Sequence, residues 1–362
     1  MVIGIDGNEA NVDEKVGVSV YAANLLYYWW RKANPKLRFK IFLKKKPLNN
    51  LPKANEHFFY EVVLGERLWS QIFLPARLNL KRDIDVFFTP AHYAPRLCPV
   101  PVVVTIHDLS YFYYPEEFLK KDLYKLESWT KYSVQKANKV IAVSQNTKKD
   151  LSKFYQVPDS KVRVIYNGYE KLLQNSRVKN QIVTGPYILY VGTLQPRKNV
   201  SLLIRAFNKF RQNNSNFRLA VVGRKGWLYQ EIFDQVKQLE LEKEVIFTDY
   251  ITDAQLVELY RNAFCFVLPS LYEGFGIPIL EAMNYGCPVI SSNVSSLPEI
   301  GGNACLYFNP KNEKELLKKL VDLKESETLR NSLIKKGKEQ IKKFSWQKCA
   351  DETLEVIKSA AK

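Results

Sequence analysis

The sequence predicts an α/β protein built from two doubly wound, Rossmann-like domains that face a central cleft. Short apolar, β-branched runs alternate with longer amphipathic segments, a pattern typical of parallel sheets covered by helices on both faces. The length of 362 residues suits two domains rather than one. The alternation is lost once, over residues 169–186, and then resumes, so we expect one domain on each side of that stretch.

We therefore predict a first domain at 1–168, a linker at 169–186, a second domain at 187–343 and a last helix at 344–362. Phe344–Ser345–Trp346 interrupts a helical, Lys- and Glu-rich end, and Ser345 is a suitable N-cap for that last helix, which could pack back on the first domain. The predicted strands are 2–5, 39–43, 58–63, 85–88, 102–106, 139–143, 162–165, 187–192, 217–223, 245–249, 264–269 and 288–292. The predicted helices between them are 17–32, 66–79, 116–136, 147–155, 199–212, 227–240, 252–262 and 277–285.

The composition excludes several classes of protein. With 46% hydrophobic and 25% charged residues the chain is globular, not disordered. The five cysteines are odd in number and form no CxxC pair, which favours buried thiols in a reducing compartment over disulfides or a zinc site. The N-terminus lacks the basic and apolar regions of a signal peptide, and no apolar run approaches the ~20 residues of a membrane span. We expect a cytoplasmic protein, at most peripheral at the inner face of the cytoplasmic membrane.

The segment PSLYEGFGIPILEAMNYGCPVIS (269–291) is the most informative loop. Two glycines precede a helix that starts near Pro278, and a helix start presents free N–H groups to an anion. Glu273 and Glu281 lie eight positions apart, so both carboxylates can face one ligand and accept hydrogen bonds from its hydroxyls. The alternative is a glycine turn with two solvated glutamates, but the agreement of glycines, proline and strand-to-helix context favours a binding site.

Two further loops follow predicted strands. In YVGTLQPRKN (190–199), Arg197 and Lys198 stand at a helix entrance with Asn199 as N-cap, and such a pair can clamp a diphosphate and neutralise a leaving group. A basic turn on a basic protein is the alternative. In VVVTIHDLSYFYYPEEF (102–118), His107 and Asp108 end a buried strand, where the histidine could donate to a sugar hydroxyl or be satisfied by a turn carbonyl.

The first strand is followed by an acidic loop and a helix that begins after Gly17. The G-x-G-x-x-G spacing of a dinucleotide fingerprint is absent, so this loop resembles a phosphate loop only weakly.

Together these motifs resemble the retaining glycosyltransferases of family 4, whose fold is the two-domain GT-B architecture. The resemblance covers essentially the whole chain and is most specific in the two C-terminal blocks that contain VGTLQPRKN and LYEGFGIPILEAM. The segments IGIDGNEAN, FFTPAHYAP and TIHDLSYFYYPE are similar to the branch rich in bacterial mannosyltransferases of surface-polysaccharide assembly.

The resemblance implies a role for each matched position. Glu273 would hold donor-sugar hydroxyls, Glu281 the ribose hydroxyls, and Arg197 with Lys198 the donor diphosphate, with His107 beside the donor sugar. Thr193 stands where some relatives carry an arginine, so Arg197 and Lys198 must supply the phosphate charge. The resemblance also implies that Tyr250 and Ile251 line the nucleobase pocket. The further donor-binding positions that it implies are Gly17, Gly192 and Gly223, and the N–H groups of the turn Gly274, Phe275, Gly276 and Ile277.

The activity implied is transfer of a hexose, with retention at the anomeric carbon, from a nucleotide-diphosphate sugar to a glycan or lipid-linked acceptor. The best guesses for the donor are GDP-mannose and then UDP-glucose. No cofactor and no metal ion are expected, because the sequence contains no cluster of metal ligands and the architecture that it resembles does not need a divalent ion. A nucleotide-sugar epimerase of the same fold is the alternative reaction.

A nucleic-acid-binding protein is the alternative outside enzymes, prompted by the net charge of +17. The charge is spread evenly, +9 over residues 1–170 and +8 over the rest, and no known binding motif appears, so we expect no nucleic acid. One local excess stands out: Arg31–Lys46 carries eight Lys or Arg without an acidic residue, and residues 67–82 form a second apolar and basic stretch. We hypothesise an anionic membrane contact there, against a solvated basic face as the alternative.

Overall fold

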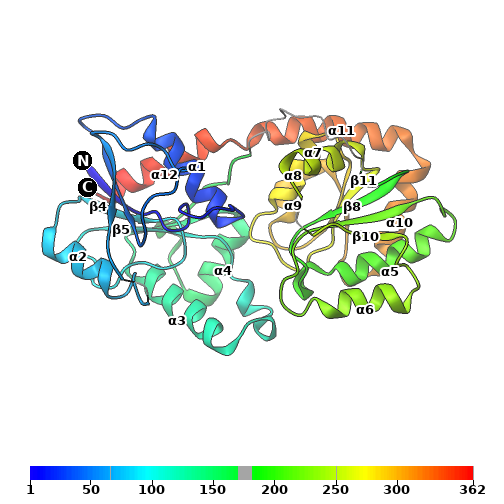
Figure 1. Ribbon diagram of the computed structural model, residues 1–362, viewed down its shortest axis with the longest axis horizontal. Coiled ribbons are helices and arrows are strands. Elements are labelled where there is room, and N and C mark those ends of the chain that lie inside the picture. Colours follow the sequence, from blue (N-terminus) through cyan, green and yellow to red (C-terminus); the bar gives the residue numbers. More distant parts are fainter. Residues whose placement is uncertain (66, 170–181, 250, 362) are drawn as a thin grey trace. The chain divides into compact units, whose positions relative to one another are not determined.

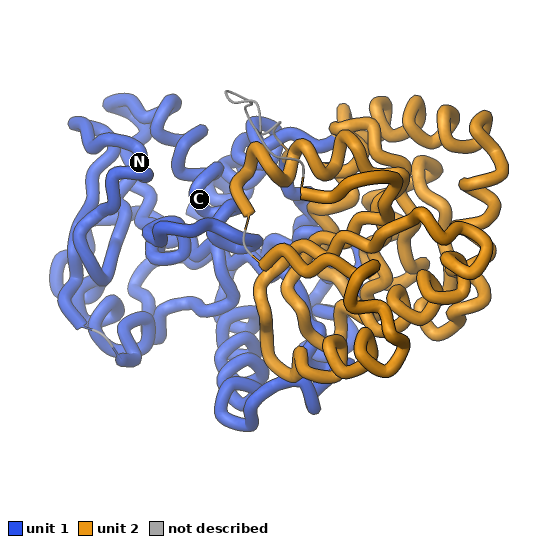
Figure 2. Tube along the Cα trace, turned by 45° about the vertical axis from the view of Figure 1, so that its right-hand side comes forward, with its two compact units in different colours: residues 1–168, 344–362 blue, residues 169–343 orange. Residues whose placement is uncertain are grey.

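The computed structural model describes residues 1–65, 67–169, 182–249 and 251–361. It divides into two compact units, shown in different colours in Figure 2: unit 1 holds residues 1–168 and 344–362, and unit 2 holds residues 169–343. Most of the predicted linker, residues 170–181, lies outside the described residues. Both units contain a parallel sheet with helices on its two faces, so the predicted α/β, doubly wound fold class is confirmed.

Unit 1 is built on a seven-stranded sheet in the order β3-β2-β1-β4-β5-β6-β7, whose described pairings are all parallel. Its strands are β1 Val2–Asp6, β2 Arg38–Leu43, β3 Phe58–Val62, β4 Val86–Thr89, β5 Val102–Ile106, β6 Lys139–Ala142 and β7 Val162–Val164. Its helices are α1 Val18–Trp30, α2 Phe73–Lys81, α3 Lys120–Lys136, α4 Gln145–Tyr155 and α12 Trp346–Ala360. The central strands are apolar throughout because helices cover both of their faces.

Two helices of unit 1 begin later than the sequence predicts. The helix predicted at 66–79 starts at Phe73, because Leu68 has a left-handed backbone (φ 56°) that an α-helix cannot contain. The helix predicted at 116–136 starts at Lys120, because Pro115–Glu117 forms a separate 3₁₀ turn and Leu119 is extended. The apolar spacing ran through both turns and gave no sign of these backbone breaks.

The last helix, α12, belongs to the core of unit 1. The Ser345 side chain accepts a hydrogen bond from Lys348 N (3.4 Å) and so caps its start. Trp346, Leu354 and Ile357 are buried in the same cluster as Trp29 of α1, whose indole Nε1 donates to Ala350 O at 2.9 Å. The chain therefore completes the core of its first sheet with its last fifteen-residue helix.

Unit 2 is built on a six-stranded sheet in the order β10-β9-β8-β11-β12-β13, again with parallel pairings (Figure 1). Its strands are β8 Tyr187–Val191, β9 Arg218–Val222, β10 Val245–Phe247, β11 Cys265–Leu268, β12 Val289–Ser292 and β13 Cys305–Phe308. Its helices are α5 Val200–Arg211, α6 Gln230–Gln238, α7 Asp253–Asn262, α8 Ile277–Asn284, α9 Leu297–Gly301, α10 Glu313–Glu325 and α11 Glu327–Gln340. The sequence missed β13, whose four residues include no β-branched side chain, and the five-residue α9.

The strand orders locate where each sheet can bind a ligand. In unit 1 the order reverses between β1 and β4, and in unit 2 between β8 and β11. Helices leave such neighbouring strands toward opposite faces, which opens a crevice at the carboxyl ends of the two strands. The loops that follow β1, β4, β8 and β11 are therefore the candidate ligand-binding loops. None of the described helices is both long and apolar enough to cross a bilayer.

Gly168 provides a test of how the chain ends of unit 1 pack. A Cβ atom at Gly168 would overlap the backbone of Ser345 and Trp346, which cannot move aside as a side chain would. We expect Gly168→Ala to lower the free energy of unfolding by about 1–3 kcal/mol, as measured by urea denaturation. Gly337→Ala is the matched control, because a Cβ there meets the flexible Met283 side chain at 3.0 Å. Equal stability of the two variants would contradict this packing.

Candidate active site

Two loops of unit 2 meet at the point where its strand order reverses. After β8 the chain passes Gly192 and Thr193 and forms a 3₁₀ turn, Pro196–Lys198, before α5. After β11 it forms an irregular loop, residues 269–276, before α8. The two loops are fastened together, since Leu271 N donates to Arg197 O at 2.8 Å and Arg197 Nη1 donates to Tyr272 O at 2.7 Å.

An ion pair joins the predicted residues of these loops. Lys198 Nζ lies 2.6 Å from Glu273 Oε1, and Arg197 Nη1 lies 4.0 Å from Glu273 Oε2. The side chains of Arg197, Lys198 and Glu273 are 10%, 17% and 13% exposed, so water screens the charges weakly while a ligand can still reach them. Three residues separated by as many as 76 positions in the sequence thus form one charged group.

Glu273 is held in its ionised form. Burial raises the pKa of Glu273, but Lys198 and then Arg197 lower it by more, and the net pKa lies below its ordinary value. At neutral pH its oxygens can therefore only accept hydrogen bonds. A carboxylate of this kind suits a ligand rich in hydroxyl groups, while the two cations suit a phosphate.

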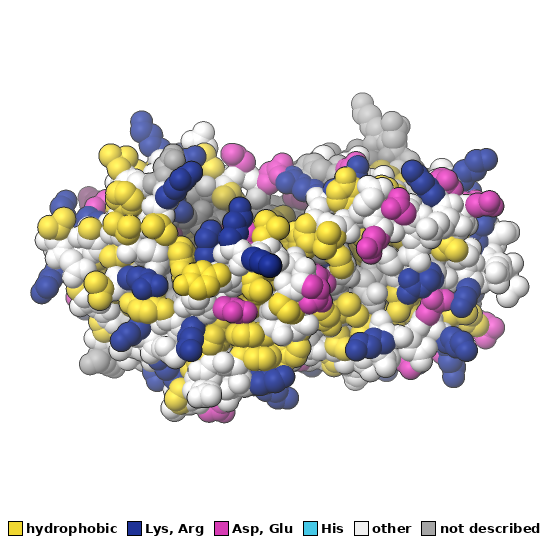
Figure 3. All heavy atoms as spheres, turned by 90° about the horizontal axis from the view of Figure 1, so that it is seen from below, with side chains coloured by type: hydrophobic (Ala, Val, Ile, Leu, Met, Phe, Trp, Pro, Cys, Tyr) yellow, Lys and Arg dark blue, Asp and Glu magenta, His cyan; other side chains and the backbone are white. Residues whose placement is uncertain are grey.

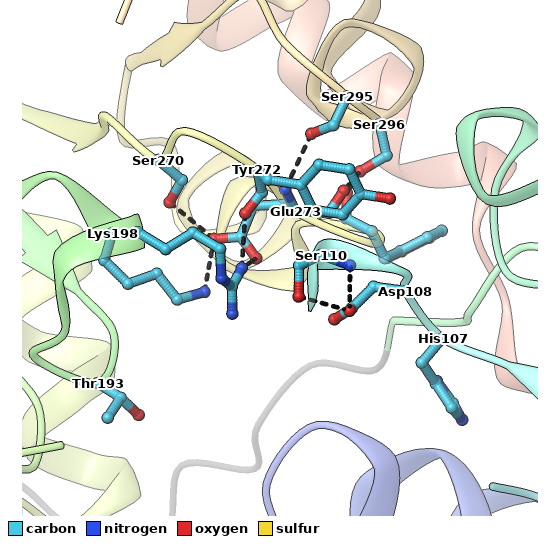
Figure 4. A network of polar contacts seen from close by, with 12 residues as sticks. His107, Asp108, Ser110, Thr193, Lys198, Ser270, Tyr272, Glu273, Ser295 and Ser296 are labelled. Carbon is cyan, nitrogen blue, oxygen red and sulfur yellow. Dashed lines mark hydrogen bonds and ion pairs between the residues drawn. The ribbon is translucent and has the colours of Figure 1, made fainter. Parts of the chain in front are cut away.

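Serine side chains that the sequence analysis did not single out hold Glu273 in place (Figure 4). Ser270 Oγ donates to Glu273 Oε1 at 2.7 Å, and Glu273 N donates to Ser295 Oγ at 2.9 Å. The hydroxyl of Ser296 lies 2.8 Å from Glu273 O and 2.9 Å from Phe275 O. Ser270 stands three residues before Glu273, a spacing that could have been noticed, whereas Ser295 and Ser296 become neighbours only through the fold.

Asn199 occupies the predicted N-cap position of α5 but does not cap it. Its backbone is left-handed (φ 57°), and its side-chain Nδ2 instead donates to Pro269 O at 3.0 Å and Pro310 O at 2.9 Å. The predicted N-cap position is therefore confirmed, but the side chain makes no capping hydrogen bond. The side chain ties the Lys198 turn to two other loops at the same edge of the sheet, which helps to fix the position of the Lys198 backbone.

The start of α8 has the backbone that the sequence indicates. Gly276 precedes Ile277 with φ 103°, and a Cβ there would also stand 2.7 Å from Leu297 Cδ2, so both conformation and space require glycine. Gly274, Phe275 and Gly276 are buried in the turn. The first N–H groups of an α-helix have no partner within it, and those of α8 begin within four residues of Glu273.

Glu281 lies in a different environment from Glu273. It accepts a hydrogen bond from the Tyr260 hydroxyl at 2.8 Å, and the Tyr260 ring stacks on Tyr285 with centroids 6.0 Å apart. Burial raises the pKa of Glu281 above its ordinary value, and the Tyr260 hydrogen bond only partly offsets this. The two glutamates of one helix entrance thus have opposite protonation tendencies, and no described hydrogen bond links them directly.

Gly192 and Gly223 end the adjacent strands β8 and β9. A Cβ at Gly223 would overlap Gly192 O, and one at Gly192 would stand 2.8 Å from the Tyr190 hydroxyl oxygen. The close approach of the two strand ends thus accounts for Gly223 by packing, and the Tyr190 side chain of its own strand accounts for Gly192. Among the implied nucleobase residues, Tyr250 lies outside the described residues, and Ile251 precedes the capping box of Thr252 and Gln255 at the start of α7.

The remaining predicted residues, His107 and Gly17, lie in unit 1 and are brought near each other there. His107 follows β5, and its ring meets the edge of the Tyr21 ring at 4.9 Å; Tyr21 N in turn donates to Gly17 O at 3.1 Å. Gly17 has φ 52°, and nothing lies within 4 Å of a Cβ built there. The carboxyl edge of this sheet therefore has space for a ligand beside α1.

His107 is a neutral imidazole at neutral pH. Burial and then His92, whose ring stacks on that of His107 with centroids 6.1 Å apart, lower the pKa of His107 to about 4. Its Nε2 lies 2.7 Å from Pro90 O, which can only accept, so Nε2 carries the proton and Nδ1 is left as an acceptor. The turn-carbonyl contact weighed in the sequence analysis is present. Any hydroxyl that binds Nδ1 must donate to it.

His92 is a neighbour that the sequence analysis did not single out. Its Nε2 accepts a hydrogen bond from His107 N at 3.3 Å, so its proton stands on Nδ1, which is buried and has no hydrogen-bond partner within the described part of the chain. Asp108 makes local contacts: its Oδ1 accepts hydrogen bonds from Ser110 N at 3.0 Å and from Ser110 Oγ at 2.8 Å. Among the described residues no His, Cys, Asp and Glu groups cluster as metal ligands.

Comparison with known proteins identifies the family. The model of Glycosyltransferase Family 4 matches residues 49–171, and that of Glycosyl transferases group 1 matches residues 174–340. O-antigen chain mannosyltransferase B of Escherichia coli is 30% identical over 287 residues, which cover 75% of this chain and 74% of that protein. The chain belongs to family 4 of the glycosyltransferases. Enzymes of this family use nucleotide-sugar donors.

Other similarities agree with this family 4 assignment. O-antigen chain mannosyltransferase RfbU of Salmonella typhimurium is 35% identical over 58% of this chain and 57% of that protein. Among solved structures, sucrose-phosphate synthase of Thermosynechococcus elongatus aligns with a TM-score of 0.78 and 19% identity over 99% of this chain and 98% of that one. WaaG, a glycosyltransferase involved in lipopolysaccharide biosynthesis, aligns with a TM-score of 0.73 and 16% identity over 99% of both chains. These structural likenesses show the GT-B fold.

The two glutamates should respond to pH in opposite directions. Because its folded pKa is lowered, Glu273 stabilises the fold above pH 4.5 and loses this contribution as the pH falls below it. Because its folded pKa is raised, Glu281 costs stability increasingly as the pH rises above 4.5. At neutral pH we expect Glu273→Gln to lower the free energy of unfolding by about 1–3 kcal/mol and Glu281→Gln to raise it.

Urea denaturation of both variants and the wild type across the acidic range tests this. The disadvantage of Glu273→Gln should shrink toward low pH, and the advantage of Glu281→Gln should shrink as well. Parallel pH profiles for all three proteins would show that neither carboxylate titrates as its surroundings indicate.

Proposed function

We propose that this glycosyltransferase moves a hexose, with retention, from a nucleotide-diphosphate sugar to a glycan or lipid-linked acceptor. Mannose from GDP-mannose is the donor that we favour, with UDP-glucose next. The sequence relatives support mannose, since the two most similar described above are O-antigen mannosyltransferases. A protein of Anabaena with 19% identity is named as a complex with UDP and glucose, and at that identity it supports only the fold.

The observation that carries the proposal is the Arg197, Lys198 and Glu273 group at the strand-order reversal of unit 2. A sugar diphosphate has a polyhydroxyl end and a polyanionic end. The ionised Glu273 accepts hydrogen bonds from the sugar hydroxyls, while Lys198 and Arg197 face the diphosphate. The N–H groups at the start of α8, near Gly276 and Ile277, supply further donors to the same anion.

Glu281 would bind the ribose hydroxyls of the donor. Its carboxylate is one helix turn further along α8 than the anion-binding N–H groups and is oriented by Tyr260. The nucleobase would lie toward Ile251 and Tyr250. Gly192 and Gly223 keep side chains away from the strand ends below the diphosphate, which is a binding role compatible with their packing role.

The chemistry that these groups support is departure of the nucleoside diphosphate. As the glycosidic bond breaks, negative charge grows on the diphosphate and positive charge on the sugar ring. Lys198 and Arg197 stabilise the first charge, and preorganised electrostatics of this kind is commonly the largest catalytic term. The acceptor hydroxyl attacks from the face that the diphosphate leaves and passes its proton to the departing phosphate. His107, being neutral, would accept a hydrogen bond from a ligand hydroxyl at Nδ1 rather than supply a charge.

Lys198→Ala tests the central group. We expect kcat to fall by at least about 10²-fold, because one cation facing the leaving group is lost. The variant should still unfold cooperatively, at a lower thermal midpoint because the Glu273 carboxylate loses its nearest cation. Lys209→Ala is the matched control, since Lys209 is an exposed lysine of α5 that pairs with Glu313. Transfer is measured with a radiolabelled donor. Near-wild-type turnover of Lys198→Ala would overturn the site assignment.

A thermal-shift screen against nucleotide sugars tests the donor. We expect GDP-mannose to stabilise the protein most, by about 2.7 kcal/mol at a hundredfold excess over its Kd, and we expect a chelator to leave both binding and transfer unchanged. A larger shift with UDP-glucose would replace mannose in the proposal. Conversion of the donor sugar in the absence of any acceptor would favour the epimerase reaction instead.

A further inference from the structure

The basic stretch Arg31–Lys46 is not one surface. Strand β2 runs through its middle and is buried, so that Arg31, Lys36 and Arg38 stand near the amino end of β2 and Lys44–Lys46 follow its carboxyl end. Two of the eight cations are neutralised internally, because Lys32 pairs with Asp351 and the buried Lys40 pairs with Asp83 at 2.6 Å. The hypothesis that this stretch forms a single membrane contact was therefore wrong in its extent.

The three lysines at the carboxyl end of β2 border an exposed apolar region. Val63 N donates to Leu43 O at 2.9 Å, which places the end of β3 beside Lys44. Lys44 Nζ lies 5.7 Å from the centre of the Trp69 ring, and Trp69 Nε1 donates to Val63 O at 2.8 Å. Lys44, Lys45 and Lys46 are all exposed.

This apolar region, which we term the α2 surface, consists of exposed side chains on α2 and the loops that flank it. Its members and their exposed fractions are Leu64 81%, Leu68 48%, Ile72 53%, Phe73 41%, Leu80 83% and Leu97 81%. Ile72, Phe73, Ala76 and Leu80 follow a helical spacing on the outer side of α2, while Leu74, Arg77 and Leu78 face inward. Large apolar side chains exposed together in this way mark an interaction site on a globular protein.

Contacts between the segments show that the α2 surface is continuous. A Cβ at Gly65 would overlap the Phe73 ring, so the Leu64 loop lies directly against α2. On the other side, Asn79 Nδ2 donates to Leu97 O at 2.9 Å, and Arg96 Nε donates to Gln71 Oε1 at 2.8 Å. The face seen in Figure 3 has apolar side chains interspersed with Lys and Arg at its left-hand end, where α2 lies in Figure 1.

Two leucines of the α2 surface have an uncommon backbone. Leu68 and Leu97 have φ of 56° and 50°, a left-handed conformation that glycine or asparagine adopts at lower cost. Their side chains are exposed, so core packing does not compensate for that cost. Backbone strain that packing leaves unexplained is typical of functional positions.

The exposed charges at the edge of the α2 surface are mostly positive. Arg67, Lys81, Arg82 and Arg96 are exposed at its edge, and Lys44–Lys46 adjoin it. The described acidic groups between residues 57 and 84 are Glu61 and Asp83, and both are held in ion pairs with Lys40 and Arg77. Asp6 and Glu9 offset part of the charge of Lys44, so the cationic border of the apolar side chains consists chiefly of Arg67, Lys81, Arg82 and Arg96.

We propose that the α2 surface and Lys44–Lys46 dock this protein on an anionic lipid bilayer. Exposed leucine, isoleucine and phenylalanine side chains enter the boundary between headgroups and acyl chains, and the surrounding lysines and arginines bind the lipid phosphates. The exposed lysines and arginines that border the apolar side chains are the feature that selects a bilayer, because anionic headgroups complement their charge while the acyl boundary accommodates the apolar side chains.

The α2 surface and Lys44–Lys46 lie near the edge of unit 1 at which His107 stands, so docking on a bilayer would bring lipid-linked molecules to that edge. Lys44 follows the carboxyl end of β2, and His107 follows the carboxyl end of β5 in the same parallel sheet, so both stand at one edge of unit 1. A bilayer bound beside this edge would present a lipid-linked acceptor toward it. This use rests on the proposed function, whereas the docking itself does not.

Flotation with vesicles tests docking independently of catalysis. We expect the wild type and the inactive Lys198→Ala to bind vesicles of equimolar phosphatidylcholine and phosphatidylglycerol and to bind pure phosphatidylcholine weakly. Lys44→Ser, Lys45→Ser and Lys46→Ser combined should weaken binding about 100-fold, at about fivefold per lysine. Ile72→Glu with Leu80→Glu should abolish binding; both side chains are exposed, so the thermal unfolding midpoint should not change.

Matched controls are Lys335→Ser, Lys336→Ser and Lys338→Ser combined, in unit 2, and Leu119→Glu, whose side chain is 65% exposed away from α2. Both should bind vesicles as the wild type does. Equal binding to pure phosphatidylcholine, equal losses in control and test variants, or self-association of the lipid-free protein that Leu80→Glu abolishes would each overturn the proposal. Because Lys198→Ala is included, loss of transfer and loss of docking are measured separately.

Discussion

The ion pair between Lys198 and Glu273 is the interaction on which the candidate site depends. It joins the loops after β8 and β11, the two strands between which the order of the second sheet reverses. Arg197 reinforces it from the same 3₁₀ turn, and Ser270 holds the carboxylate from the strand side. Because these side chains are only slightly exposed, each charge acts strongly on the others. A ligand that carries both hydroxyls and phosphates can form hydrogen bonds with the carboxylate and ion pairs with the two cations.

The two glutamates of the segment 269–291 show how the surrounding residues give two side chains of the same type different protonation states. Glu273 faces two cations and stays ionised, so it is a strong acceptor. Glu281 accepts a hydrogen bond from Tyr260 and forms no ion pair within the described part of the chain, so burial raises its pKa and it holds a proton more readily. Glu273 precedes α8 and Glu281 lies within it, and the residues that approach from the 3₁₀ turn and from α7 decide their charge.

The ends of β4 and β5 in unit 1 carry neutral histidines, unlike the charged group of unit 2. His107 and His92 stack, both are half-buried, and the pKa of each is lowered, so neither brings a charge to the ends of β4 and β5. Positive charge is found instead at the exposed ends of β2 and around α2, beside apolar side chains. The carboxyl edge of this sheet thus has two parts: neutral rings stand at the ends of β4 and β5, and cations stand at the end of β2.

The sequence by itself determined the fold class, the family and the identity of the charged loops. Apolar runs of strand length, the spacing of Glu273 and Glu281, and the Arg197–Lys198 pair are local patterns, and local patterns follow from chain geometry. Only the tertiary structure decided what these residues touch. Ser295 and Ser296 support Glu273 although they lie over twenty positions away in the sequence. The Asn199 side chain connects two loops and makes no capping hydrogen bond. Lys40 forms an ion pair with Asp83 and is not part of the exposed basic surface. The physical reason is the same in each case: hydrogen bonds and ion pairs depend on distances of a few ångströms between segments that the sequence separates, and only the packing of the sheets sets those distances.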